Sequence, residues 1–591
     1  MAELDRQILK PMVRNSAIAF WVMTTTAFLL VTLYYIIFHH VEPLSRDQWQ
    51  MYQALFDRGL VDTSLGTVSG HRHILAFMLY HIDMALFDGR NRFLVGIDWL
   101  LNGALIFLLC SQAWKLPLSK LARTLFCGWI IILLTWLLNI ALLGWGFNGL
   151  NNYLSLVPGV FALFFLHHAV RQNRSVLAVV AGLLGILATL SFANGILVWP
   201  TALIVLYLLH ASRVFYIWML VAMTAAIAAY VLLPGADAAG EALKWPGSAF
   251  VIFPFQVMGG PIYHLLRSWQ AGDPQWLRVV SNGAGFLITV TALCRFGKLL
   301  YQRPMPNAFQ TLCVALMCFG AGSCIMLSMS RLDEFLDPAV DRFQIFALLV
   351  WIGTSGLIVS TANPATVRRW EAVFIIFPFL AFPSQLDWGA RLAEYRNRVD
   401  MSLLAYQVYL PLEKDTEKAL HWNWENKLPA FFTVLEQIRH DKKNIFHTGT
   451  ADFIGKPFRA AMNLPVCNVT EMDSTTITAS ELLKPEERVS IANLPQAQLY
   501  RIESSSNSQR VGQRWHFTVH DAQWDSGLLL DTQQTARGLV YPVNNSRLPR
   551  ANGHRKADFN AYGVVRLDDQ NQVARTLVLL DGNNQVCQHD L

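Results

Sequence analysis

The chain has 591 residues, of which 53% are apolar and 15% are charged, whereas about 25% charged residues is usual for a soluble globular protein. This composition excludes a disordered chain, a fibrous repeat and an ordinary cytosolic enzyme. The net charge of +6 is not a sign of nucleic-acid binding, because much of the basic charge lies in short connections between apolar segments. We therefore expect a membrane protein with no nucleic-acid partner.

The apolar residues are gathered into segments long enough to cross a bilayer. Stretches such as 18–38, 125–143 and 312–329 are nearly free of charge, and about 20 residues at 1.5 Å each cross a hydrocarbon core of roughly 30 Å. The first stretch is not followed by a small-residue cleavage site, so we interpret it as a span rather than a signal peptide. The pattern predicts about 11 spans, near residues 16–38, 93–113, 124–144, 152–170, 176–192, 195–212, 214–233, 279–297, 308–329, 344–362 and 371–387.

Every second connection between these spans is basic. Short basic connections lie on the cytoplasmic side of a membrane, which predicts a cytoplasmic N-terminus. An odd number of spans then places the C-terminal region on the outer face. The outer segments are residues 39–92, 234–278 and 330–343 together with the tail, and these are the parts that could build an extracytoplasmic site. The basic connections are residues 6–14, 115–123, 171–174, 213, 295–303 and 368–369.

The composition changes near residue 388, which predicts a membrane domain over residues 1–387 and a soluble domain over residues 388–591. We expect a mainly α protein, with a polytopic helix bundle and a C-terminal extracytoplasmic α+β or β-sandwich domain. That domain either binds glycans or forms a structural cap over the membrane site. Helical periodicity covers 388–409 and 412–440, and short alternating runs predict strands at 498–502, 515–519, 527–530, 538–543, 562–567 and 575–580.

Two of the eight cysteines, Cys467 and Cys587, lie in this tail, whereas the other six lie in or beside spans. An oxidising compartment favours a disulfide bond between the two, and the alternative is a pair of free buried thiols.

The first outer segment carries an acidic residue near its start, just after the first span: Asp47 in the stretch SRDQW. A carboxylate close to the membrane surface suits a general base that deprotonates a hydroxyl group. Aspartate at such a position also serves as a helix N-cap. Trp49 is a candidate platform for a sugar, or a member of an interfacial aromatic belt.

The same segment continues with SGHRH and an amphipathic stretch up to residue 87. Arg72 and Asp83 are 11 residues apart, about three helical turns, which predicts that they project from one helix face. Arg72 is a candidate phosphate ligand, and His71, His73 and Asp83 are candidate acceptor contacts. The alternative for each histidine is a surface residue, and the pair defines no metal site because no third ligand is fixed.

Two further outer segments contain candidate residues. Arg331 and Arg342 bracket an acidic stretch at the mouth of a span, where the planar fork of arginine binds phosphate well. Lipid head-group contact or a salt bridge is the alternative. Asn194, in the stretch FANG, is a turn residue or a substrate contact.

These residues carry a resemblance to the GT-C class of integral-membrane glycosyltransferases, which use polyprenyl-phosphate sugars. The chain is similar in its first span, in the long outer loop with an acid near its start, in the amphipathic helices of that loop, in about 11 spans and in a soluble domain after the last span. The resemblance covers nearly all of residues 1–388. Stretches that resemble a bacterial subgroup are HRHILAFMLYHIDMALFDGRNRFL, GWGFNGLNNYLSLVPGVFAL, SFANGILVWP and DRFQIFALLVWIG.

The resemblance implies an enzyme of the bacterial inner membrane with a periplasmic C-terminal domain. It implies that Asp47 is an inverting general base and that Arg342 holds the lipid phosphate, with Arg331 or Arg72 as rivals. Many members have two adjacent acids, whereas here Arg46 precedes Asp47, so no metal site is assigned and dependence on a divalent cation stays open. Asp57 is the fallback base.

The donor implied by the resemblance is a polyprenyl-phosphate-linked sugar, and the acceptor is a surface glycan, lipopolysaccharide or an exported protein. The competing interpretations are a transporter or flippase of lipid-linked sugars and an envelope assembly protein without enzymatic activity. Transporters often contain internal repeats, and the sequence shows none.

Overall fold

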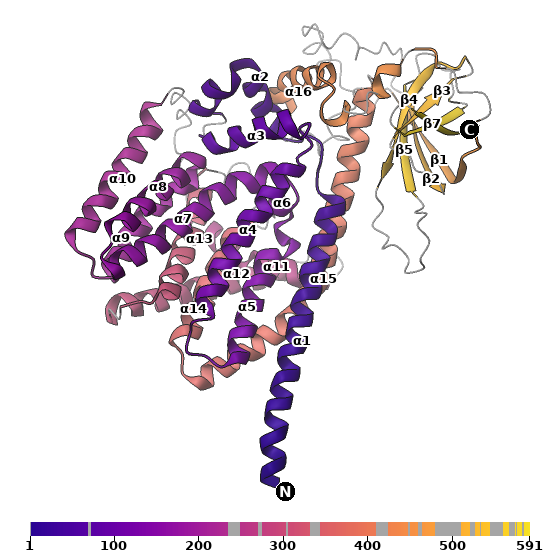
Figure 1. Cartoon of the computed structure of the whole chain (residues 1–591). Coiled ribbons are helices and arrows are strands. Elements are labelled where there is room, and N and C mark those ends of the chain that lie inside the picture. Colours follow the sequence, from indigo (N-terminus) through magenta and orange to yellow (C-terminus); the bar gives the residue numbers. More distant parts are fainter. Residues whose placement is uncertain are drawn as a thin grey trace. The chain divides into compact units, whose positions relative to one another are not determined.

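The chain divides into two compact units in the computed structural model, and each is described by itself (Figure 1). The bundle unit comprises Met1–Ile37, Leu60–Leu79 and Leu94–Ala390, and the mixed unit comprises Phe38–Gly59, Tyr80–Phe93 and Arg391–Leu591. The structure describes residues 2–68, 72–233, 249–269, 275–302, 305–330, 343–408, 424–446, 450–454, 456–458, 464–478, 510–520, 526–531, 533–543, 559–566, 574, 576–581 and 584–590.

All eleven segments expected to be spans are helical. In the described part of the chain, nine helices are long and apolar enough to cross a membrane, and Ser175–Ser191 and Ala193–Leu208 are shorter apolar helices. The protein is therefore a multi-pass membrane protein, and the mainly α fold class is confirmed. The helices are α1 (Ala2–His39), α2 (Gln48–Leu65), α3 (Ile74–Leu86), α4 (Arg92–Ala113), α5 (Lys120–Thr135), α6 (Ile140–Leu143), α7 (Gly146–Gln172), α8 (Ser175–Ser191), α9 (Val198–Leu208), α10 (Arg213–Leu232), α11 (Ala249–Arg267), α12 (Gln275–Gln302), α13 (Ala308–Ser330), α14 (Gln344–Thr361), α15 (Pro364–Gln407) and α16 (Trp424–His440), with short 3₁₀ turns η1 (Leu137–Asn139), η2 (Ala193–Leu197), η5 (Asn444–Phe446) and η6 (Thr450–Phe453).

Several helices of the bundle unit begin at residues whose side chains satisfy free backbone N–H groups. The Ser119 hydroxyl accepts from the Ala122 N–H at 3.0 Å where α5 begins. Asn363 accepts from the Thr366 N–H at 2.9 Å, and Pro364 occupies the first position of α15, where no N–H is needed. These local signals fix where the helices start.

Small residues let the helices of the bundle unit approach closely. A Cβ atom on Gly185 of α8 would lie 2.8 Å from the Trp199 ring of α9, and one on Gly182 would lie 3.1 Å from Ala222 of α10. Such contacts are typical of helices that associate in a membrane, where packing rather than water exclusion drives association.

A similar close approach joins α4 and α7. A Cβ atom on Gly149 would lie 2.1 Å from the Asp98 carboxylate and 2.1 Å from the Leu142 carbonyl oxygen. Asp98 is fully buried in the α4 span, and neither of its carboxylate oxygens has a hydrogen-bond partner among the described residues. Glycine is required at residue 149 because any side chain would meet this carboxylate.

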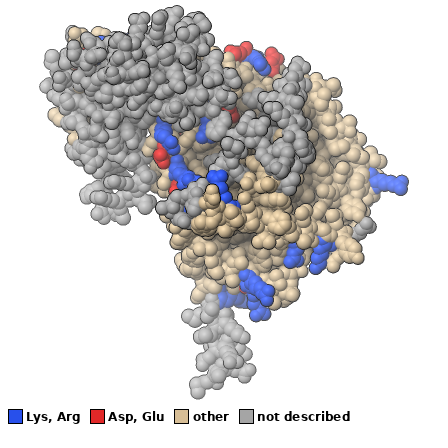
Figure 2. All heavy atoms as spheres, turned by 180° about the vertical axis from the view of Figure 1, so that it is seen from behind, with Lys and Arg blue, Asp and Glu red and all other residues tan. Residues whose placement is uncertain are grey.

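The surface of the bundle unit is largely uncharged. Apolar side chains of α10 such as Val214, Ile217 and Val221 are more than half exposed, as expected for a helix that faces lipid. Figure 2 shows this surface as a broad tan area with Lys and Arg in a few separate groups.

The mixed unit combines helical segments with one antiparallel sheet. Of the two forms expected for the tail, the α+β form is the one seen, because the described strands all belong to a single sheet with the order β1-β2-β5-β4-β3-β6-β7. The buried runs Leu528–Leu530 and Leu577–Val578 form part of its core. The expected run 498–502 lies outside the described residues. The strands are β1 (Asn468–Thr478), β2 (Arg510–His520), β3 (Ser526–Leu530), β4 (Ala536–Val543), β5 (Phe559–Arg566), β6 (Thr576–Asp581) and β7 (Asn584–Asp590).

A disulfide bond links the segment before β1 to strand β7. Cys467 and Cys587 are joined, with their Cα atoms 5.2 Å apart. Beside this bond, the Cys467 N–H donates to the Gln588 carbonyl at 2.8 Å and the Gln588 N–H donates to the Pro465 carbonyl at 3.0 Å. The chain therefore pairs with β7 at one edge of the sheet before it forms β1 at the other edge.

Candidate functional site

The turn that follows the first span leads directly into α2. The Ser45 N–H donates to the Gln48 side-chain oxygen at 3.1 Å, and the Gln48 N–H donates to the Ser45 carbonyl at 3.2 Å. This reciprocal pairing closes the turn and starts the helix. Asp47 lies in the turn, half-buried, and its carbonyl accepts from the Met51 N–H at 3.2 Å. Asp47 immediately precedes α2, and a helix N-terminus favours a negative charge, so both the catalytic and the structural interpretation of Asp47 fit its position.

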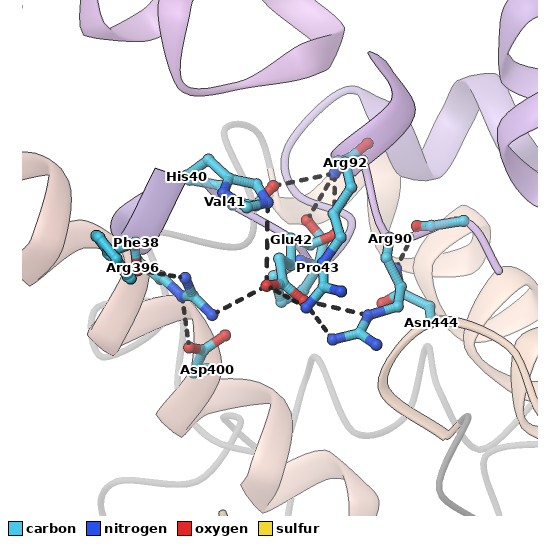
Figure 3. A network of polar contacts seen from close by, with 12 residues as sticks. Phe38, His40, Val41, Glu42, Pro43, Arg90, Arg92, Arg396, Asp400 and Asn444 are labelled. Atoms are coloured by element: carbon cyan, nitrogen blue, oxygen red, sulfur yellow. Dashed lines mark hydrogen bonds and ion pairs between the residues drawn. The ribbon is translucent and has the colours of Figure 1, made fainter. Parts of the chain in front are cut away.

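A cluster of arginines surrounds one carboxylate close to this turn (Figure 3). Glu42 accepts from Arg90 at 2.6 Å and 3.2 Å, and from Arg92 at 3.0 Å. A third arginine, Arg396 of α15, donates to Glu42 at 3.3 Å. The Glu42 cluster, as we call it, consists of His40, Glu42, Arg90, Arg92, Arg396 and Asp400.

The electrostatics of the Glu42 cluster favour an anion. Burial raises the pKa of Glu42, but the charges of Arg396, Arg90 and Arg92 outweigh burial and lower the pKa to about 2. Glu42 is therefore ionised at neutral pH. Burial raises the pKa of Asp400 to about 6, so Asp400 is also mostly ionised at neutral pH. Three guanidinium groups then face two carboxylates, which leaves one positive charge. The Arg92 side chain is 55% exposed, so it can reach a further ligand.

The loop between α3 and α4, residues 87–91, carries Arg90 and is built around two buried polar residues. The Asp83 carbonyl accepts from the Phe87 and Gly89 N–H groups at 2.9 Å and 3.0 Å, and the Asp83 carboxylate accepts from the Asn91 N–H at 3.3 Å. Asn91 donates to the Glu42 carbonyl at 3.2 Å and accepts from the Gln48 side chain at 2.7 Å. Asn91 thus ties this loop to the Asp47 turn.

Asp83 is fully buried beside Tyr52 of α2. Burial raises the pKa of Asp83 to about 7, against the lowering effects of the Asn91 N–H and the Tyr52 hydroxyl. The Tyr52 hydroxyl and one Asp83 oxygen have no hydrogen-bond partner of standard geometry among the described residues. The bonds that Asp83 makes to the loop give it a structural role, and a contact of Asp83 with the acceptor stays a prediction.

Trp49 packs into the interior of the mixed unit. Its ring is fully buried and meets the edge of Phe431 of α16 at 4.7 Å between ring centres. The expectation of an open sugar platform at Trp49 does not fit this packing, because a sugar can stack only on an exposed ring face and the Trp49 side chain is fully buried. Trp49 belongs to the apolar core between α2 and α16.

Arg72 takes a place in the bundle unit that differs from the expected helix face. Helix α3 begins at Ile74, after Arg72, so helical spacing does not relate Arg72 to Asp83. The buried guanidinium donates to the backbone carbonyls of Tyr230 at 2.7 Å, Leu65 at 2.5 Å and Leu233 at 2.6 Å. Three carbonyl partners favour a structural role over phosphate binding.

His73 and Asn194 are also buried in the bundle unit. His73 Nδ1 lies 3.1 Å from the Asn151 side-chain oxygen, and its ring lies 5.7 Å from Phe192, two residues before Asn194 in the chain. Burial contradicts the alternative interpretation of His73 as a surface residue, while a contact of His73 with the acceptor stays a prediction. His71, Arg331 and Arg342 lie outside the described residues.

Sequence reasoning missed the arginines of the Glu42 cluster. Arg90 and Arg92 stand in the stretch GRNRF, inside one of the segments that carried the family resemblance, which is the one signal that could have pointed to them. Arg396 lies about 300 residues further along the chain, and its pairing with Glu42 has no sequence signature. Within the described ranges, no group of three His, Cys, Asp or Glu side chains could hold a metal ion.

No protein-family description and no curated protein sequence matches the chain. Among solved structures, an oligosaccharyltransferase from Archaeoglobus fulgidus, tethered with an acceptor peptide containing the NVT sequon via a disulfide bond, matches with a TM-score of 0.35 and 13% sequence identity. The match covers 65% of this chain and 57% of that one, so the chain spans little more than half of its length.

Proposed function

We propose that the protein is a GT-C-type membrane glycosyltransferase that moves a sugar from a polyprenyl-phosphate donor to an extracytoplasmic acceptor, with inversion. The observation that carries the proposal is the Asp47 turn in the mixed unit. It places a half-buried carboxylate five residues after Glu42, whose cluster of three arginines has an excess positive charge. A base and an anion-binding group are the two elements that such a reaction needs.

The chemistry follows from these two elements. Asp47 accepts the proton of the acceptor hydroxyl, and the resulting oxygen nucleophile attacks the anomeric carbon of the donor sugar. The bond between that carbon and the phosphate oxygen breaks, and both electrons leave with the lipid phosphate. Arg92 and Arg90 neutralise the charge that develops on the phosphate, for which guanidinium groups are well suited. Arg331 and Arg342 remain proposed phosphate contacts, and His71 a proposed acceptor contact.

The proposed setting is the bacterial inner membrane, with a cytoplasmic N-terminus and a periplasmic domain over residues 388–591. The alternation of basic connections supports this orientation. The disulfide bond between Cys467 and Cys587 supports an oxidising compartment for the tail. Acceptors in that compartment are surface glycans, lipopolysaccharide and exported proteins.

The proposal is tested by transfer of a labelled sugar from a polyprenyl-phosphate donor in proteoliposomes. We expect Asp47→Asn to lower kcat by about 10²-fold or more, because a positioned base contributes that much. Asp62→Asn is the matched control, since Asp62 is an exposed aspartate further along α2. Asp57→Asn tests the fallback base.

Full transfer by a folded Asp47→Asn protein would reject the proposed base. If the donor crosses the bilayer but no sugar reaches an acceptor, a flippase replaces the transferase. If the donor is neither consumed nor moved, the enzyme interpretation fails and an assembly protein is the remaining candidate.

A further inference from the structure

The loop over residues 87–91 holds an unusual backbone conformation. Three of its residues have positive φ angles, 60° at Asp88, 67° at Gly89 and 59° at Asn91. Glycine adopts this conformation freely, but for other residues it costs roughly 1–2 kcal/mol each, with Asp and Asn the most tolerant. Such a loop persists only where its surroundings fix it, and loops of this kind concentrate at functional sites.

Part of this fixation comes from the C-terminal region of the chain. The Asn444 N–H donates to the Asp88 carbonyl at 2.6 Å, and the Asn444 side chain donates to the Gly89 carbonyl at 2.5 Å. Lys443 forms an ion pair with the Asp88 carboxylate at 2.9 Å. Asn444 is 2% exposed and lies next to Arg90 in Figure 3. Three bonds therefore reach the two residues that precede Arg90.

Asn444 is itself held in place by helix α16. The Phe431 ring of α16 lies edge-on to Trp49 at 4.7 Å and to Tyr406 of α15 at 4.7 Å, and all three rings are buried. After α16 the chain turns with a positive φ of 53° at Lys442 and 50° at Asn444. One segment, residues 424–446, thus contacts both the helix that follows Asp47, through Trp49, and the arginine loop, through Asn444.

We infer that Asn444 is a positioning residue, which sets the Arg90 and Arg92 side chains at the phosphate-binding part of the proposed site. The inference rests on the proposed function and deepens it, because it gives the C-terminal region a part in donor binding. Asn444 touches neither donor nor acceptor. It acts through the carbonyls of Asp88 and Gly89, so its effect falls on the affinity for the donor phosphate.

Two variants separate the bonds that Asn444 makes. Asn444→Asp keeps the shape but places a carboxylate against the Gly89 carbonyl, which removes the side-chain bond and adds repulsion. Asn444→Gly keeps the positive φ and the backbone bond to Asp88, and it loses the side-chain bond to Gly89. Asn173→Asp is the matched control, because Asn173 ends α7 with the same φ of 50° and lies far from the loop in sequence.

Steady-state kinetics in proteoliposomes give the first measurement. We expect Asn444→Asp to raise KM for the polyprenyl-phosphate sugar about tenfold and Asn444→Gly about fivefold, which corresponds to the loss of one hydrogen bond. KM for the acceptor and kcat should change little, and the control should match the wild type. An unchanged donor KM overturns the inference, as does a fall in kcat alone, which would indicate only a smaller folded fraction.

Limited trypsin digestion gives a second measurement that needs no transfer activity. Cleavage after Arg90 should be several-fold faster in Asn444→Asp than in the wild type, and unchanged in Asn173→Asp. If the wild type transfers no sugar, the proposed function fails, while faster cleavage still supports the positioning of the loop. Equal cleavage in all the proteins rejects the positioning itself.

Discussion

Replacing Glu42 with glutamine tests how strongly the Glu42 cluster holds the mixed unit together. The carboxylate is 13% exposed, and its pKa is about 2 against an ordinary value of 4.5. A difference of about 2.5 pKa units, at 1.36 kcal/mol per unit, corresponds to about 3 kcal/mol of folding free energy. Glu42→Gln keeps the shape of the side chain and removes its charge, which leaves three guanidinium groups with one carboxylate. We expect its free energy of unfolding at pH 7 to fall by about 3 kcal/mol.

The assay is unfolding by SDS in mixed detergent micelles, repeated across pH. Because the folded pKa of Glu42 is depressed, its contribution is complete above about pH 4.5 and is lost as the pH falls toward about 2. The difference between Glu42→Gln and the wild type should therefore shrink in that window. Glu394→Gln is the control, because Glu394 pairs with Arg398 at 3.5 Å with both side chains more than 60% exposed, and such pairs contribute about 0–1 kcal/mol. Equal losses in the two variants, or a difference that is independent of pH, would refute the reasoning.

Two further predictions concern buried groups. Burial raises the pKa of Asp83 from 3.8 to about 7, so the folded protein keeps a proton that the unfolded chain releases, and stability falls as the pH rises from about 4 to 7. We therefore expect Asp83→Asn to raise the apparent Tm at pH 8 and to change it little at pH 4. A larger gain in Tm at pH 4 than at pH 8 would contradict this. Gly149→Ala should destabilise the bundle unit by more than about 2 kcal/mol, because a Cβ at 2.1 Å from two oxygen atoms forces backbone movement. Gly103→Ala is the control: no atom lies within 4 Å of the new Cβ, so this substitution should stabilise the bundle unit by about 0.5–1 kcal/mol. If Gly149→Ala and Gly103→Ala had similar effects on the yield of detergent-solubilised protein, the close approach of Gly149 to Asp98 would be refuted.

The fold was predictable where the signal is local. Runs of apolar residues predict the spans, because each span must form all its backbone hydrogen bonds within its own helix and must present apolar side chains to the hydrocarbon core. Five of the predicted strands correspond to β2–β6. Strands β1 and β7 were missed because their residues, among them Asp473 and Gln588, are polar and do not alternate clearly with apolar ones.

The candidate site was predictable only in part. Asp47 stood out because it lies near the start of the long outer loop that follows the first span. Glu42 and its arginines come from three segments, and nothing in a single sequence relates residues 42, 90 and 396. The residue type of Arg72 made it one of three candidates for phosphate binding, but its guanidinium donates to backbone carbonyls. The charge of an arginine therefore does not show whether it binds a ligand or has a structural role through hydrogen bonds to the backbone.

The disulfide bond between the segment before β1 and strand β7 affects whether the edge of the sheet can pair with other chains. Open sheets expose edge strands whose free N–H and C=O groups recruit other chains. Here the backbone of residues 465–467 forms hydrogen bonds with part of the β7 edge, and the Cys467–Cys587 disulfide bond keeps this segment in place. Reduction of the disulfide bond would allow residues 465–467 to dissociate from β7, so thiol reagents during purification should promote self-association through the sheet edge. The oxidised chain should stay dispersed.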